Sequence, residues 1–192
     1  EAAAAASRVG VGRPAAPPTL SWAALHAELA EALDDFDEPR AQAILDRLLA
    51  LTTLETLLSE VVLPYLNQLG RRWARGDASI AQEHFASALL RGRLLGIARG
   101  WGLGIGPKAV LAGLPGEHHD LGLIAFGLAL RTRSWRIVYL GPDTPIATLE
   151  DACRPLEPSL VVLSAVTDER VRPVVEQLRG LAAHWRLALG GA

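Results

Sequence analysis

The sequence contains one cysteine and no methionine among its 192 residues. A single cysteine, Cys153, excludes an internal disulfide and with it the disulfide-stapled scaffolds of small secreted proteins. We expect Cys153 to be a small core residue on a helix. Because translation begins with methionine, the residue at position 1 predicts a fragment or a processed product, and the Ala-, Gly- and Pro-rich stretch 1–18 is typical of a flexible linker.

Long hydrophobic runs and clusters of one charge sign are also missing. The longest uncharged apolar run near the middle, Leu121 to Leu130, is far shorter than a membrane span. No charged segment followed by an apolar one opens the chain, so we expect no signal peptide, no membrane contact and a cytoplasmic location. The net charge is −2 and no concentrated Lys/Arg face exists, so the chain is not expected to bind DNA by itself.

Between residues 19 and 100 the apolar spacing is helical throughout, which predicts a four-helix bundle. The expected helices cover residues 20–33, 37–51, 54–73 and 79–99. Pro64 lies inside the third of them and predicts a bend there.

Three of these helices begin at residues that suit a helix N-terminus. Asp37 is predicted to cap the second helix. Thr52 with Glu55, and Ser79 with Gln82, have the spacing of capping boxes before the third and fourth helices.

From residue 108 onward the pattern changes to short apolar strands that alternate with helices. The expected strands are 108–114, 136–140, 160–166 and 186–189, and the expected helices are 120–133, 145–155 and 168–184. This alternation predicts a parallel sheet with helices on both faces, so the fold class is α + α/β, a bundle followed by a Rossmann-like (flavodoxin-like) domain. Residues 101–107 contain a Gly-x-Gly-x-Gly run, but it precedes the first strand instead of following it, so it is a linker and not a dinucleotide-binding turn.

The loop after the first of these strands carries the residues most suited to chemistry. It reads Gly116-Glu117-His118-His119-Asp120-Leu121-Gly122 and leads into a helix, the place where ligands collect in open α/β sheets. The Glu117 carboxylate could accept from one ring nitrogen of His119 and leave the other free for a metal. Spacing from the residues alone leaves His118 and His119 as equal candidates.

Taken with two later blocks, this loop resembles the cobalamin-binding module of methionine synthase and its relatives. That signature is Asp-x-His-x-x-Gly, 41 residues, Ser-x-Leu or similar, and then Gly-Gly. Here Glu117-x-His119-x-x-Gly122 is followed by 41 residues, by Ser164-Ala165-Val166 and, 23 residues later, by Gly190-Gly191. The resemblance covers both halves of the chain, since the family places a helical bundle before the α/β domain.

The resemblance implies a role for each of these residues. His119 becomes the lower axial ligand of cobalt, and Glu117 hydrogen-bonds its other ring nitrogen. His118 is then expected to face solvent or the edge of the corrin ring, and Asp120 is expected to contribute to cofactor binding. The residues implied to contact the nucleotide tail of the cofactor are Gly122, Ser164, Val166, Gly190 and Gly191.

Within this superfamily, Trp73 followed after nine residues by Glu83-His84 is similar to the light-sensing CarH group of MerR-type regulators. In that group the tryptophan covers the upper face of adenosylcobalamin and the Glu-His pair contacts the adenosyl group. An aromatic wall can shield a labile bond, and a carboxylate can accept from ribose hydroxyls. Without the resemblance, Trp73 is better explained as a core residue of the bundle.

One position departs from the group's pattern. Members that lock a light state do so with a histidine directly after the tryptophan, and here that position is Ala74. Alanine cannot coordinate cobalt. We therefore expect that illumination does not give a product with two histidine ligands through position 74. The upper face of the cofactor could then be occupied by water, by His84, by another upper ligand or even by a second chromophore.

Three hypotheses for function follow. The leading one is the cobalamin-binding, oligomerising sensor module of a light-responsive transcriptional regulator, not an enzyme, with DNA bound only by a domain missing from the N-terminus. The second is a corrinoid shuttle protein of a methyltransferase system. The third is a flavodoxin-like response module without cobalamin. A full module would also have a fifth strand and a last helix after Gly191, so the α/β domain 108–192 is expected to be truncated, with one bare edge strand.

Overall fold

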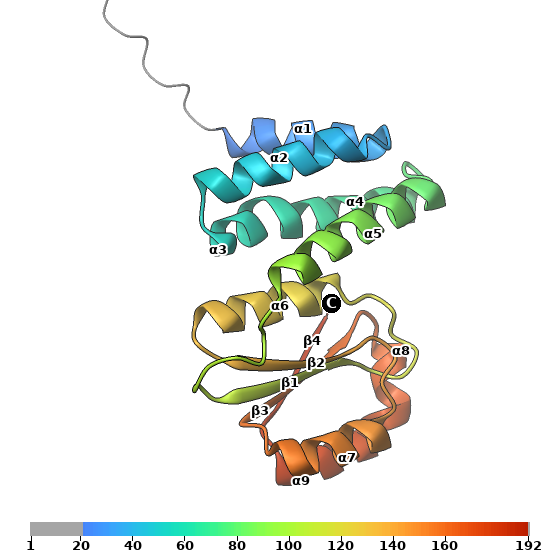
Figure 1. The fold of residues 1–192 in the computed structure, drawn as a ribbon. Coiled ribbons are helices and arrows are strands. Elements are labelled where there is room, and N and C mark those ends of the chain that lie inside the picture. The colour runs from blue at the N-terminus through green and yellow to red at the C-terminus, as the bar shows by residue number, and fades with distance from the viewer. Residues whose placement is uncertain (1–20, 192) are drawn as a thin grey trace, which may run out of the picture.

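The computed structural model describes residues 21–191, in which a helical part lies on an α/β part (Figure 1). The expected linker 1–18 lies outside the described residues. The helical part consists of α1 (Trp22–Asp34), α2 (Glu38–Leu51), α3 (Leu54–Leu57), the π-helical turn η1 (Leu58–Val62), α4 (Leu63–Arg75) and α5 (Ile80–Ile97).

The helices begin where side chains satisfy their first N–H groups. Asp37 accepts from Arg40 N–H at 3.0 Å, as predicted for α2. Ser79 and Gln82 form the expected reciprocal capping box at the start of α5. The predicted box with Thr52 is wrong, because Thr52 is extended and ends α2, and the next residue, Thr53, caps α3 instead.

The third predicted helix is one continuous rod made of α3, η1 and α4. Its predicted bend takes the form of the π-helical turn directly before Pro64, whose missing N–H interrupts the regular hydrogen-bond ladder. Gly76 ends the rod in the left-handed conformation at φ 78°, so α4 stops at Arg75. Trp73 therefore lies in the last turn of α4.

The α/β part follows the predicted alternation. Its elements are β1 (Lys108–Gly113), α6 (Leu121–Thr132), β2 (Arg136–Gly141), α7 (Ile146–Leu156), β3 (Leu160–Ala165), α8 (Asp168–Val171), the 3-10 turn η2 (Arg172–Val174), α9 (Val175–His184) and β4 (Leu187–Gly191). The predicted single helix 168–184 is broken around Pro173, which cannot donate to the helical ladder. All strand pairs are parallel in the order β2-β1-β3-β4, so the expected α + α/β architecture is confirmed.

The sheet separates two hydrophobic cores. Ala109 and Leu111 of β1 face a core shared with α6 and the bundle, whereas Val110 and Ala112 face a second core shared with α7 and α9. This alternation follows from the two-residue period of a strand. The first core joins the bundle to the α/β part, so α5 and α6 pack directly on each other.

The structure also shows the surroundings of Cys153 and of Trp101. Cys153 is a buried residue of α7, as predicted, and its free thiol lies among apolar side chains. Trp101, in the segment expected to be a linker, is buried and packs edge-on against Tyr139 at 5.5 Å.

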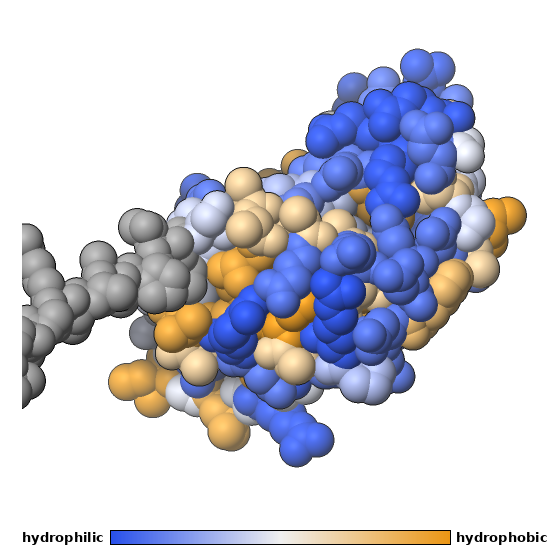
Figure 2. Space-filling model, turned by 90° about the horizontal axis from the view of Figure 1, so that it is seen from above, coloured by the Kyte–Doolittle hydropathy of each residue, from blue (hydrophilic) through white to orange (hydrophobic). Residues whose placement is uncertain are grey.

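The outer face of the bundle mixes hydrophilic and hydrophobic side chains (Figure 2). Ion pairs between α1 and α2, Arg40 with Glu31 and Arg47 with Glu28, lie on the bundle surface. No helix among residues 21–191 is long and apolar enough to cross a membrane.

Candidate functional site

The three sequence blocks of the predicted site meet at the carboxyl ends of adjacent strands. In the sheet register Gly113 of β1 pairs with Ser164 of β3, and Ser164 pairs with Gly190 of β4. The Ser164 hydroxyl is buried and has no hydrogen-bond partner among the described residues. A buried hydroxyl without a partner is costly, so this position suits a ligand that brings its own polar group.

The two consecutive glycines beside Ser164 have different reasons to lack a side chain. A β-carbon at Gly191 would lie 1.6 Å from the Ala165 carbonyl oxygen, so only glycine allows this strand pairing. At Gly190 no atom lies within 4 Å of where a β-carbon would stand. The space next to Ser164 is therefore open at the end of β4.

Glu117 is the central residue of the loop between β1 and α6. Its side chain is buried, and both carboxylate oxygens are engaged. Oε1 accepts from the backbone N–H of His119 at 2.9 Å and lies 2.7 Å from the His119 Nδ1, while Oε2 accepts from the backbone N–H of Val166 at 2.6 Å. One carboxylate thus ties the loop to the end of β3 and sets the direction of the imidazole.

The charge on Glu117 is maintained by these contacts. Burial alone raises the pKa of its carboxyl, but the hydrogen bonds from Val166 and His119 outweigh it and hold the pKa below its ordinary value. An ionised carboxylate 2.7 Å from Nδ1 favours the tautomer with the proton on Nδ1. The Nε2 lone pair is then free, and the imidazole is largely exposed, with 76% of the His119 side chain accessible.

The rest of the loop is held by the turn after β2. The Asp143 N–H donates to the Glu117 carbonyl at 2.8 Å, and the Asp143 carboxylate accepts from Gly116 N–H at 2.7 Å. Asp143 itself has a positive φ of 50°. His118 is exposed as well, but the structure distinguishes the two histidines, because of the two only His119 has its Nδ1 held by a carboxylate.

Asp120 is placed differently from the other loop residues. It is buried, and its carboxylate accepts from Arg91 Nε at 2.7 Å and from the Tyr139 hydroxyl at 2.5 Å. Burial and then this hydrogen bond raise the pKa of Tyr139, so its hydroxyl remains a donor. The Asp120 carboxylate is thus already occupied within the protein, in contrast to its predicted role at the cofactor face.

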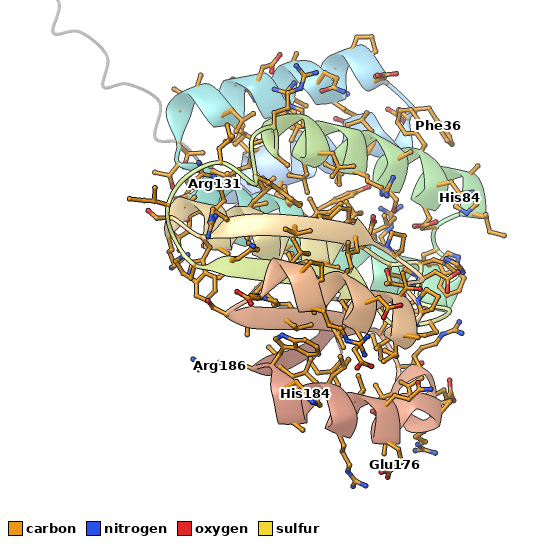
Figure 3. All side chains as sticks on the ribbon, turned by 60° about the horizontal axis from the view of Figure 1, so that its bottom comes forward. Phe36, His84, Arg131, Glu176, His184 and Arg186 are labelled. Carbon is orange, nitrogen blue, oxygen red and sulfur yellow. The ribbon has the colours of Figure 1, made fainter. Side chains whose placement is uncertain are left out.

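The three predicted bundle residues lie around the turn between α4 and α5. In Figure 1 this turn lies at the same end of the molecule as the carboxyl ends of the strands. Trp73 is 54% exposed, which excludes its alternative explanation as a core residue. Glu83 accepts from the Ser87 hydroxyl at 2.7 Å, and His84 projects from the first turns of α5 at the edge of the molecule (Figure 3).

An aromatic pair that includes Phe85, the residue after His84, joins α5 to the turn between α1 and α2. Phe85 packs against Phe36, with ring centroids 5.3 Å apart, and Phe36 lies in the turn between α1 and α2 at a positive φ of 58°. Figure 3 shows Phe36 and His84 at the same end of the helical part.

Several residues that build this site could not be identified from sequence motifs. Arg91, Tyr139 and Asp143 come from three other elements and match no motif. Gly122, predicted to approach a ligand, has no atom within 4 Å of its would-be β-carbon. Among the described residues no group of three or more His, Cys, Asp or Glu side chains could hold a metal ion.

Comparison with known protein families gives two matches. Residues 25–95 match one family described as a B12 binding domain, and residues 107–192 match a second family with the same description.

Two curated proteins of Myxococcus xanthus are similar to this chain. They are the HTH-type transcriptional repressor CarH, 32% identical over 172 residues, and the HTH-type transcriptional repressor CarA, 34% identical over 168 residues. These alignments cover 90% and 85% of this chain but only 56% and 52% of the repressors. The chain thus spans about half the length of the curated relatives that it matches.

Among solved structures, the monomethylamine corrinoid protein of Methanosarcina barkeri has the same fold. The TM-score is 0.71 at 14% identity, and the match covers 90% of this chain and 86% of that one. The resemblance drawn from the sequence blocks is therefore confirmed. With B12-binding domains matched in both its helical and its α/β part, the chain belongs to the family of B12-binding proteins, and it is similar to the repressors CarH and CarA over most of its own length.

Proposed function

We propose that this chain is the cobalamin-binding sensor module of a light-responsive transcriptional regulator, and that adenosylcobalamin is its cofactor. His119 is the lower axial ligand of cobalt. The observation that carries this proposal is the Glu117 carboxylate, which holds His119 Nδ1 at 2.7 Å and leaves Nε2 exposed. A histidine that donates its other ring N–H to a carboxylate is the usual arrangement for a metal ligand.

The residues around His119 fit the remaining parts of such a cofactor. The buried Ser164 hydroxyl lacks a partner, and the open space over Gly190 next to it can receive a polar tail. Val166 contributes its backbone N–H to Glu117, so the end of β3 is linked to the position of the imidazole. The protein side chains and backbone groups that would bind the cofactor are therefore preorganised.

The upper face is assigned to the bundle. Trp73 is exposed in the last turn of α4, and Glu83 and His84 begin α5 at the same end of the molecule as the strand ends. Bound adenosylcobalamin would supply a cobalt–carbon bond that light breaks. The protein's own contribution is an aromatic wall and a carboxylate able to accept from ribose hydroxyls.

Regulation is proposed from the similarity to the two repressors, whose names describe HTH-type transcriptional repressors. The DNA contact would come from a domain outside this chain. We expect the module to form a homo-oligomer with adenosylcobalamin in the dark and to change its oligomeric state on illumination.

The test is to mix the purified protein in the dark with adenosylcobalamin or with methylcobalamin and to measure the spectrum and the mass before and after green light. Retention of adenosylcobalamin with a light-dependent change in mass supports the sensor module. Retention of methylcobalamin with no effect of light would favour a corrinoid shuttle protein. Retention of neither cofactor contradicts both.

A second prediction concerns Ala74, which is exposed directly after Trp73. Illumination should not give a product with two histidine ligands through position 74, because alanine offers no donor atom, so any absorption spectrum of cobalt with two histidine ligands should disappear in His84→Ala. The variant Ala74→His should acquire that spectrum. A two-histidine spectrum in the unaltered protein that persists in His84→Ala would contradict this prediction.

A further inference from the structure

Asp120 occupies the N-cap position of α6 but does not cap that helix. Aspartate at this position normally accepts from the N–H groups of the first turn, which stabilises the helix. Here the side chain makes no cap hydrogen bond. Its carboxylate turns instead to Arg91 and Tyr139, 29 residues before it and 19 residues after it. Asp120 thus forms hydrogen bonds with residues distant in the sequence in place of a local helix cap.

The three residues come from three different layers of the molecule. Arg91 belongs to α5 of the bundle, Asp120 directly precedes α6, and Tyr139 lies on β2. The Asp120 side chain is 5% exposed, so its bonds are well shielded from solvent, while Arg91 reaches it from a side chain that is 43% exposed. Tyr139 is fixed in turn by its edge-on contact with Trp101. The contact therefore joins the bundle to the sheet through Asp120, the residue directly before α6.

The position of this contact in the chain connects the two faces of the candidate site. Asp120 directly follows His119 in the sequence. Arg91 lies on the same helix as Glu83 and His84, about two turns further along. A displacement of α5 relative to the His119 loop would move the upper-face residues relative to the lower ligand.

We propose that Arg91, Asp120 and Tyr139, which we call the latch, position the bundle over the His119 loop and thereby set the contact of the bundle with the upper ligand. This inference rests on the proposed function of the site. The three side chains are positioning residues: they act through α5 and the loop and need not touch the cofactor. When the latch opens, the Asp120 carboxylate has a second partner at hand in the free N–H groups at the start of α6, which lowers the cost of opening.

The closing experiment first measures the latch without any cofactor. Spin labels at Ala81→Cys on α5 and Asp168→Cys on α8, both exposed positions, report the distance between the bundle and the α/β part. The native Cys153 does not compete for the label, because it is buried and burial raises its pKa to about 11. Arg91→Gln and Tyr139→Phe should each broaden or shift the distance distribution.

The matched control is Arg133→Gln. Arg133 lies directly after α6 and pairs with Glu55 of α3 at 2.7 Å, so it too joins the bundle to the α/β part, but on an exposed surface away from the His119 loop. This control should leave the distance distribution unchanged. Unchanged distances in both latch variants, or equal changes in Arg133→Gln, would overturn the proposal.

The second arm compares binding of adenosylcobalamin and hydroxocobalamin, which share the lower face and differ in the upper ligand. In the latch variants the ratio of the affinity for adenosylcobalamin to that for hydroxocobalamin should fall about tenfold, a typical size for coupling between two sites. Their affinity for hydroxocobalamin should stay the same. A preference equal to that of the parent would overturn the positioning role. If the parent binds neither cobalamin, the proposed function fails, while the distances still decide whether the latch holds the bundle.

Discussion

Replacing His119 with alanine should lower the affinity for cobalamin by on the order of 100-fold or more, above the roughly 10–100-fold cost of losing an outer partner of a metal ligand. The reason is that the Glu117 carboxylate holds the Nδ1 of His119, which leaves the Nε2 of the same ring free to bind cobalt. The measurement is retention of added cobalamin on gel filtration, together with its visible spectrum, which reports the nitrogen ligand below cobalt.

The neighbouring residue provides a matched control. His118 is also exposed, but its ring is not held by Glu117, so His118→Ala should bind cobalamin nearly as well as the parent. Circular dichroism should show the same fold in both variants, because both side chains are exposed. Equal losses in the two variants, or greater loss in His118→Ala, would show that the assignment to His119 is wrong.

Replacing Glu117 with alanine should destabilise the cofactor-free protein. The substitution leaves two N–H groups, of His119 and Val166, without their acceptor. A buried donor left unpaired costs about 1–3 kcal/mol. For a protein of this size each kcal/mol lowers the melting temperature by about 2–4 °C, so thermal unfolding followed by circular dichroism measures the effect.

The same carboxylate predicts a dependence on pH. Its folded pKa lies below the ordinary value of 4.5, so its stabilisation is fully present above about pH 4.5 and is lost as the pH falls through the lower folded pKa. Glu117→Ala should therefore lose stability at neutral pH and show a weaker decline in acid than the parent does. Glu150→Ala, at a surface ion pair with Arg154, is the control and should change neither quantity by much. An acid profile in Glu117→Ala identical to that of the parent would contradict the prediction.

A conservative change separates the two roles of Glu117. Glu117→Gln retains an acceptor oxygen for Val166 N–H but carries no charge to favour the proton on His119 Nδ1. We expect this variant to recover part of the stability and to lose roughly 10–100-fold in cobalamin affinity.

The helical part illustrates which features are predictable from neighbouring residues. Asp37 and the Ser79–Gln82 box cap their helices as expected, because the bonds span only three residues. Thr52 and Thr53 are both suitable caps, and only the backbone conformation decides that Thr53 is used. Such single-residue shifts are typical of helix boundaries and do not affect the fold.

Asp120 illustrates the opposite case. An aspartate before an apolar helix is locally a cap, and next to His119 it also suggests a contact with the cofactor. Neither reading includes Arg91 or Tyr139, because the contact forms only when α5 packs on α6 and β2 lies beside β1. No spacing in the chain signals a bond between residues that far apart.

The amino-acid sequence is enough to predict the alternation of helices and strands, the parallel sheet and the family, because these depend on hydrophobic periodicity and on three blocks at fixed spacing. It also selected His119 and Glu117 through that spacing. Three features of the site are visible in the folded chain and not in the sequence. Gly113, Ser164 and Gly190 share one register of the sheet. Both Glu117 carboxylate oxygens accept hydrogen bonds, and Asp120 joins the bundle to the sheet. The physical reason is that these contacts join residues tens of positions apart, and burial of the shared core between the bundle and α6 brings them together.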